Sequence, residues 1–102
     1  MRYEIYLNQS PDNFMGYKPS DKMKLVYSGD LSGVLAYRTG VYPQTLTKIF
    51  EIFNIAHPED YTSRSLSVGD VVVLLAHGEY IGYACEMVGW KTIRYYDMEA
   101  TV

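Results

Sequence analysis

The chain has 102 residues, 48% of them hydrophobic and 21% charged, which argues against global disorder and predicts one domain over residues 1–102. A formal net charge of -3 argues against the positive field that non-specific nucleic-acid binding needs, and the lone Cys85 excludes an intrachain disulfide. The first residues do not resemble a signal peptide, and no apolar run approaches the roughly 20 residues that cross a bilayer. We therefore expect a cytoplasmic protein without a membrane association.

In chain order, apolar residues that alternate with polar ones predict a first strand over residues 2–8. Residues 9–21 contain Pro, Gly, Ser and Asp, which predict a loop. The β-branched and aromatic residues of Lys24–Ser28 predict a second strand. Residues 29–42 contain three glycines, and we interpret them as a structured loop, with a short extra strand as the alternative.

The segment Pro43–Asn54 gives the clearest helical pattern of the chain. Leu46, Ile49, Phe50 and Phe53 follow the spacing i, i+3, i+4 and i+7, which places them on one stripe of a helix. A helix of this length is marginal on its own, so the stripe predicts that a sheet lies beneath it.

The C-terminal third predicts a three-stranded antiparallel meander. Residues 71–75 form a continuous apolar run, typical of a strand that is covered on both faces. His77-Gly78 and Val88-Gly89 predict two tight turns, and residues 90–96 predict the last strand. On the middle strand, one face carries the set expected in the core: Ile81, Tyr83, Cys85 and Met87.

These elements predict an α+β fold, in which two N-terminal strands and the meander form a small antiparallel sheet packed on one main helix. The eleven tyrosines fit this reading because tyrosine suits half-buried strands. An open edge of such a sheet could pair with a second copy, so we expect a monomer or a homodimer through a sheet edge.

The residues that could carry chemistry do not form a recognisable site. His57, His77 and Cys85 lack the spacing of a metal site, and the strand pattern predicts that the Cys85 thiol is buried and unreactive. Neither a Gly-x-Ser-x-Gly segment nor a Gly-rich phosphate loop occurs. We therefore expect no catalytic residue, no metal and no cofactor.

One candidate partner surface is the outer face of the meander, where we place Tyr80, Glu86, Trp90 and Arg94. Tryptophan and tyrosine are frequent anchors of protein interfaces, and Gly82 within the strand indicates a bulge or a close approach of another group. The alternative is that Trp90 begins a strand and covers the edge of the core.

A second candidate is the polar connector over residues 57–67, where Asp60, Tyr61, Arg64 and Ser65 could recognise a polar partner. The alternative, which we favour, is a loop that its own side-chain hydrogen bonds hold in place.

Several segments resemble the YodL-like domain family of Firmicutes. They are Val26–Leu31 (VYSGDL), Thr45–Asn54 (TLTKIFEIFN), Pro58–Tyr61 (PEDY), Ser65–Val73 (SLSVGDVVV) and Gly89-Trp90. The resemblance covers about residues 1–8 and 24–94, and the Ser-Leu-Ser-Val-x-Asp block is fairly specific. The stretch Ser32–Gln44 departs from the family because it is longer than the short turn expected there.

The resemblance implies a biological setting rather than a chemistry. Domains of this family occur alone and within multidomain proteins of conjugative elements and phages. The namesake is associated with Bacillus sporulation and with antagonism of the bacterial actin-like cell-shape protein. The family supplies no established catalytic residue.

Our leading hypothesis is a non-catalytic protein-interaction domain, encoded by a mobile genetic element or acting as an antagonist of a host protein. The first alternative is a nucleic-acid-associated accessory module of conjugation or phage defence. It requires one continuous basic face built from Lys18, Lys22, Lys24, Lys91 and Arg94. The second alternative is an enzyme with a polar site in the connector, which requires a cleft there.

Overall fold

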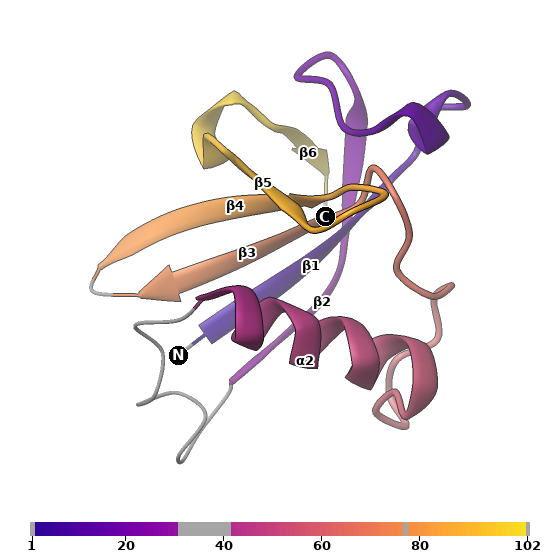
Figure 1. Ribbon diagram of the computed structural model, residues 1–102, viewed down its shortest axis with the longest axis vertical. Helices are drawn as coiled ribbons and strands as arrows, with labels where there is room; N and C mark the ends of the chain where they lie inside the picture. The colour runs from indigo at the N-terminus through magenta and orange to yellow at the C-terminus, as the bar shows by residue number, and fades with distance from the viewer. Residues whose placement is uncertain (1, 31–41, 77, 102) are drawn as a thin grey trace.

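The computed structural model describes residues 2–30, 42–76 and 78–101 (Figure 1). Along the chain its elements are β1 (Arg2–Asn8), η1 (Asn13–Met15), β2 (Lys22–Asp30), α2 (Tyr42–Ile55), β3 (Val71–Ala76), β4 (Glu79–Cys85), β5 (Trp90–Ile93), η2 (Tyr95–Asp97) and β6 (Glu99–Thr101). Residues 31–41 lie outside the described residues, and so does most of the loop predicted over 29–42. Its first two residues, Gly29 and Asp30, instead belong to β2.

The described strands form one sheet in the order β5-β4-β3-β1-β2-β6. All neighbouring strands are antiparallel except β2 and β6, which are parallel. The predicted α+β fold is therefore confirmed, with the meander β3-β4-β5 and the N-terminal pair β1-β2. The sequence did not predict β6, because its three residues are all exposed and show no apolar alternation.

Helix α2 covers one face of the sheet (Figure 1). Its side chains Leu46, Ile49 and Phe53 are fully buried against Ile5 of β1 and Val72 of β3, among others. Burial of each such side chain stabilises the fold by roughly 1.5–3 kcal/mol. The predicted stripe therefore anchors the helix, and it fixes which side of α2 faces the strands.

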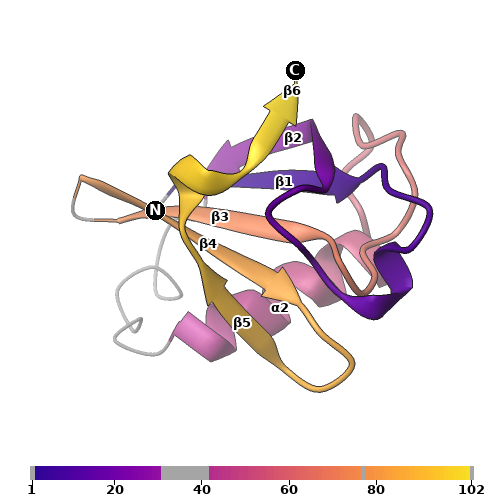
Figure 2. The same cartoon turned by 90° about the horizontal axis from the view of Figure 1, so that it is seen from above.

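The opposite face of the sheet is covered by the loop after β1 and by the C-terminal segment, which Figure 2 shows across the sheet from α2. Tyr17 from the loop and Tyr95 and Met98 from the C-terminal segment pack against a buried cluster that includes Val71 and Val73. Strand β3 is thus buried on both faces, and this explains its uninterrupted apolar run and confirms that prediction.

The two turns of the meander differ from each other. The pair Ala76↔Glu79 leaves two residues between β3 and β4, as predicted, with Gly78 at φ +79° and His77 outside the described residues. The predicted two-residue turn at Val88-Gly89 is wrong. Strand β4 ends at Cys85, which pairs with Trp90, so the connection covers Glu86–Gly89.

This longer connection corrects the predicted core set of β4. Met87 lies beyond the end of the strand and its side chain is 87% exposed, whereas Tyr83 and Cys85 are buried as expected. The predicted close approach at Gly82 is present: a Cβ at this position would lie 2.7 Å from Cγ1 of Ile93.

Other element bounds shift modestly from those that the sequence predicted. Strand β2 is longer than Lys24–Ser28, and its register against β1 shifts between Ile5 and Tyr6. Strand β5 ends at Ile93 and gives way to η2, so only part of residues 90–96 is a strand. Among the described residues, no helix is both long and apolar enough to cross a membrane.

Candidate functional site

A groove of about 480 Å³ lies between α2 and the hairpin of β4 and β5. Its lining is mainly apolar and includes Leu46, Phe50, Tyr83, Cys85, Met87 and Trp90. The strands β4 and β5 form the floor of the groove, and α2 forms one wall. Among the described residues of the α2 stripe, only Phe50 is in ring contact with β5, and the space around this contact forms the groove.

Trp90 and Phe50 meet edge to face at the groove, with ring centroids 6.2 Å apart and planes 81° apart. Trp90 pairs with Cys85 across the β4–β5 ladder, so its side chain stands on the same sheet face as α2. Such an aromatic pair contributes about 0.5–1.5 kcal/mol beyond its area burial. Both rings are only half-buried, so parts of their surfaces remain accessible to another molecule.

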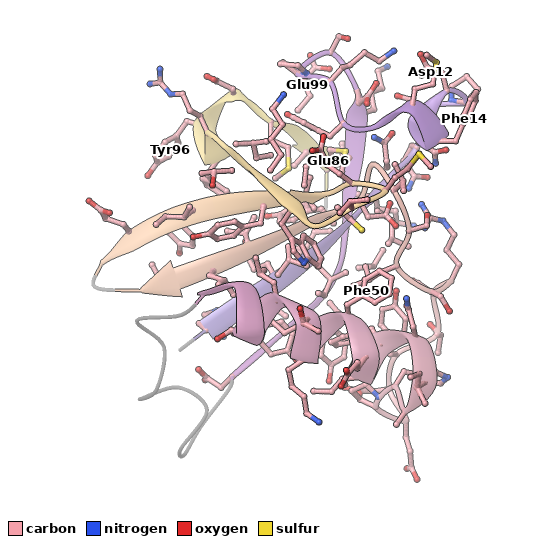
Figure 3. The ribbon with its side chains drawn as sticks, viewed as in Figure 1. Asp12, Phe14, Phe50, Glu86, Tyr96 and Glu99 are labelled. Atoms are coloured by element: carbon pink, nitrogen blue, oxygen red, sulfur yellow. The ribbon has the colours of Figure 1, made fainter. Side chains whose placement is uncertain are left out.

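Beside the groove lies an apolar patch formed by Phe14, Met15, Met87 and Val88, which we call the rim patch. The exposed fractions of these four side chains run from 69% to 92%. A smaller hollow of about 320 Å³ separates Phe14 and Met15 on η1 from the β4–β5 connection. Figure 3 shows Phe50 on α2, Glu86 at this connection and Phe14 on η1. Clustered exposed apolar side chains of this kind mark interaction sites.

The Cys85 thiol at the floor of the groove is suited to packing rather than to nucleophilic attack. Burial, with smaller contributions from the charges of Asp70 and Glu86, raises the pKa of this thiol to about 11. At neutral pH the sulfur is therefore protonated, and thiolate is the nucleophilic form.

The structure does not bring the four residues of the predicted meander surface together. Tyr80 stands on the sheet face opposite α2 and stacks on Tyr95 with centroids 4.9 Å apart, whereas Trp90 faces α2. Arg94 follows β5 and lies 3.7 Å from the Asp97 carboxylate. Glu86 lines the groove with Trp90. The assumption that all four share one outer face is wrong, because the pleat places Tyr80 and Trp90 on opposite faces.

The connector residues mostly contact their own chain. Tyr61 is buried, and its hydroxyl donates a hydrogen bond of 2.5 Å to the Arg64 carbonyl. Asp60 accepts a hydrogen bond of 3.0 Å from the Tyr27 hydroxyl. The carbonyl of Ser65 accepts a hydrogen bond of 3.0 Å from the Arg64 guanidinium. These contacts agree with the favoured alternative, a loop that its own side chains hold.

The family model of the YodL-like domain matches residues 1–95 of the chain. The chain belongs to the YodL-like domain family. No curated protein and no solved structure matches it. The resemblance seen in the sequence is therefore confirmed, and the motifs that carry it can be placed on the fold.

The most specific motif of the YodL-like domain, Ser65–Val73, forms a polar clamp at the entry to β3. Asp70 is 1% exposed and accepts hydrogen bonds from the backbone N–H of Asn8 and of Ser67, each at 2.8 Å. The Arg64 guanidinium donates to the same carboxylate at 2.6 and 2.8 Å. This motif joins the end of β1 to the start of β3, so its role here is structural.

A second pair extends the clamp of the YodL-like domain. The Asn8 amide donates to the Asp21 carboxylate at 2.9 Å and to the Gly69 carbonyl at 3.0 Å. The Lys18 backbone N–H donates to Asp21 at 2.9 Å. Asn8 and Asp21 were not predicted from the sequence. The sequence indicates their role only in that each is a polar residue at the boundary of a predicted strand or loop.

The rim patch was not predicted either, although the sequence contains a pattern that indicates it. Phe14-Met15 and Met87-Val88 each stand directly before a glycine, Gly16 and Gly89, and both glycines have positive φ. Phe14 and Met15 belong to the short η1, which buries none of its residues, and Met87 and Val88 lie beyond the end of β4. That pattern marks apolar side chains that a loop holds in solvent.

The basic residues of the nucleic-acid alternative come from three parts of the YodL-like domain: the loop before β2, strand β2 itself, and β5 with the residue that follows it. Lys22 and Lys24 lie on β2, whereas Lys91 lies on β5, and the strands β1, β3 and β4 stand between them in the sheet. Lys18 pairs with the Asp12 carboxylate, which offsets its charge.

Proposed function

We propose that this YodL-like domain is a non-catalytic protein-interaction domain that binds an apolar segment of a partner protein in the groove between α2 and the β4–β5 hairpin. One observation carries the proposal: the half-buried pair Phe50 and Trp90 lies in a groove that adjoins the exposed rim patch. A partner that covers this exposed apolar surface removes it from water, and this removal favours binding.

The energetics favour Trp90 as the anchor of such an interface. Tryptophan is among the residues that most often dominate binding energy, above all where a pocket surrounds it. Each apolar side chain that moves from water into the groove contributes roughly 1.5–3 kcal/mol. The flexible Met87 and Met15 beside it can adapt to the shape of a bound segment.

Two features support a non-catalytic role. The thiol at the floor of the groove, Cys85, has a raised pKa and is protonated at neutral pH. In the connector, Arg64 and Asp70 are engaged with each other and with backbone groups, so their hydrogen-bonding capacity is used inside the fold.

We take the first partner to test, the bacterial actin-like cell-shape protein, from the resemblance, and we expect the encounter in the cytoplasm. A gene carried by a mobile element would fit a domain that antagonises a host protein. Because the chain holds a single tryptophan, its fluorescence reports directly on the occupancy of the groove.

The test titrates the purified actin-like protein, labelled with an acceptor dye, into the domain and follows the quenching of Trp90 fluorescence. We expect Met87→Asp and Val88→Asp to weaken binding by about tenfold or more, because each places a charge in the buried interface. The matched control is Ile55→Asp, which changes another exposed apolar residue, at the end of α2.

The proposal fails if Ile55→Asp weakens binding as much as the rim-patch variants do. It also fails if the bound partner leaves Trp90 fluorescence unchanged and protects neither the groove nor the rim patch in hydrogen exchange. If the actin-like protein does not bind, the proposal is tested by crosslinking in cell extract. The proteins crosslinked to the wild type are then compared with those crosslinked to Met87→Asp. A partner lost from the variant supports the proposal, and no difference refutes it.

A further inference from the structure

The groove is open on one side, and that side is the edge of the sheet. Strand β5 pairs with β4, and no other strand among the described residues pairs with its outer edge. The third side of the groove, beyond β5, is therefore formed by no element that the structure describes. An element seated there would close the groove.

The backbone of β5 presents hydrogen-bonding groups to this open side. The N–H of Glu86 donates to the carbonyl of Gly89 at 3.1 Å, so the hydrogen-bonded pairs of the ladder continue at Lys91 and Ile93. By the alternation of an antiparallel ladder, the N–H and C=O groups of Trp90 and Thr92 point away from β4. The same two residues direct their side chains to the groove.

The opposite sheet face of β5 carries positive charge. Lys91 alternates with Trp90 and Thr92 and so stands on the face away from α2, and it makes no ion pair with the residues that the structure describes. Arg94 follows at the end of the strand with its side chain 85% exposed. A side chain directly opposite Lys91 on an added strand would lie about 5 Å away, measured between Cβ atoms.

We propose that β5 binds an extended segment of the partner as an additional strand, whose apolar side chains enter the groove while its acidic side chains lie beside Lys91. This inference rests on the proposed function and names the kind of segment bound. The added strand would lie about 4.8 Å from β5, form backbone hydrogen bonds with Trp90 and Thr92, and supply the missing wall of the groove.

Charge decides between a partner segment and a second copy of this chain. Two copies that paired through β5 would each bring Lys91 to the shared edge, and like charges on facing strands destabilise a sheet; Arg94, which follows β5, is paired with Asp97. An edge lysine is also a common protection against self-pairing. A segment of alternating apolar and acidic residues meets no such repulsion, and its carboxylates neutralise Lys91.

The first experiment titrates the full chain with a short synthetic peptide of alternating valine and glutamate, acetylated and amidated at its ends, while Trp90 fluorescence is recorded. Replacing glutamate by lysine in the peptide should weaken binding by about fivefold or more. Methylation of the backbone nitrogens that face β5 should weaken it by about tenfold or more, because the side chains remain but the donors are lost.

The second experiment changes β5 itself. Thr92→Pro removes the N–H that points to the open edge and leaves the ladder to β4 complete, whereas Thr92→Val keeps the N–H. We expect peptide binding to be lost in Thr92→Pro and kept in Thr92→Val. In wild type, the peptide should slow hydrogen exchange at the Trp90 and Thr92 amides, a result that does not depend on whether the proline variant folds.

The inference is refuted if the methylated peptide binds as well as its parent, or if the peptide changes Trp90 fluorescence without slowing exchange at Thr92. In both cases the groove is occupied and the proposed function stands. It is also refuted if the chain forms a dimer that Thr92→Pro dissociates, since the second copy is then the occupant. A further result would refute strand addition but not the proposed function: Met87→Asp loses binding to the partner protein, while no peptide binds to the wild-type chain.

Discussion

Arg64 donates two hydrogen bonds, at 2.6 and 2.8 Å, to the nearly fully buried carboxylate of Asp70. The guanidinium also donates to the Asn8 carbonyl at 3.3 Å, so one side chain links the connector, the end of β1 and the start of β3. A carboxylate buried to this degree is stable only where cations and hydrogen-bond donors surround it.

Arg64→Ala should therefore lower the free energy of unfolding by about 1–3 kcal/mol, because it leaves the buried Asp70 carboxylate without its cation. Solvent screens part of this ion pair, because the Arg64 side chain is 42% exposed. Urea denaturation followed by circular dichroism measures the loss. The matched control is Lys48→Ala, which breaks the exposed ion pair with Glu51 and should cost about 0.5 kcal/mol or less. Equal losses in the two variants would contradict the clamp.

Gly69 and Gly89 offer a second comparison, because both have positive φ, +92° and +78°, but different surroundings. Gly89→Ala should cost about 1–2 kcal/mol for the left-handed backbone alone, since open space surrounds the added Cβ. Gly69→Ala should cost clearly more, because its Cβ would lie 2.5 Å from the Asn13 carbonyl oxygen. Thermal and urea unfolding of both variants test this order, and a Gly89→Ala loss that equals or exceeds the Gly69→Ala loss would refute it.

The sequence predicted those parts of the fold that periodicity controls. The stripe of α2 and the apolar run of β3 follow from one-dimensional spacing, because burial on one or both faces imposes it. Strand β6 could not be predicted, since a strand of three exposed residues is held by its pairing with β2 and not by its own pattern.

The candidate site was predicted only in part, for a physical reason. Trp90 was identified by its residue type, but its partner Phe50 was assigned to the core because it shares the stripe with Phe53. Whether a stripe residue is fully covered depends on how far the sheet extends beneath the helix, which the spacing does not encode. Met87 was misplaced because the length of the β4–β5 connection is set by pairing.

The Cys85 thiol gives a prediction about reactivity. Because burial raises its pKa to about 11, from a reference value of 9.0, the thiolate fraction at mildly alkaline pH should be about a hundredfold lower than in the unfolded chain. Iodoacetamide should therefore modify the folded domain at least about a hundredfold more slowly than the same chain in guanidinium chloride. Mass spectrometry of timed samples measures both rates. A folded rate within about threefold of the unfolded rate would show that the thiol is neither buried nor protonated.

Asp21 gives a prediction about acid stability. Burial alone would raise the pKa of this carboxyl, but the hydrogen bonds donated by the Asn8 amide and the Lys18 backbone N–H outweigh it and hold the pKa below its usual value. A carboxyl whose pKa is lower in the folded state than in the unfolded state stabilises the fold fully above the unfolded value, about 3.9. That contribution disappears as the pH falls through the folded pKa.

Asp21→Asn should remove the pH-dependent part of this contribution: the amide oxygen can still accept from Asn8 and Lys18, whose bonds both go to one carboxylate oxygen, but the new side chain carries no charge and does not titrate. The difference in unfolding free energy between wild type and variant should be constant from neutral pH to about pH 5 and should shrink at lower pH. Urea titrations over this range, with Asp97→Asn at the exposed ion pair as the matched control, measure it. A difference that stayed constant down to about pH 2 would mean that Asp21 stabilises the fold through packing and not through its charge.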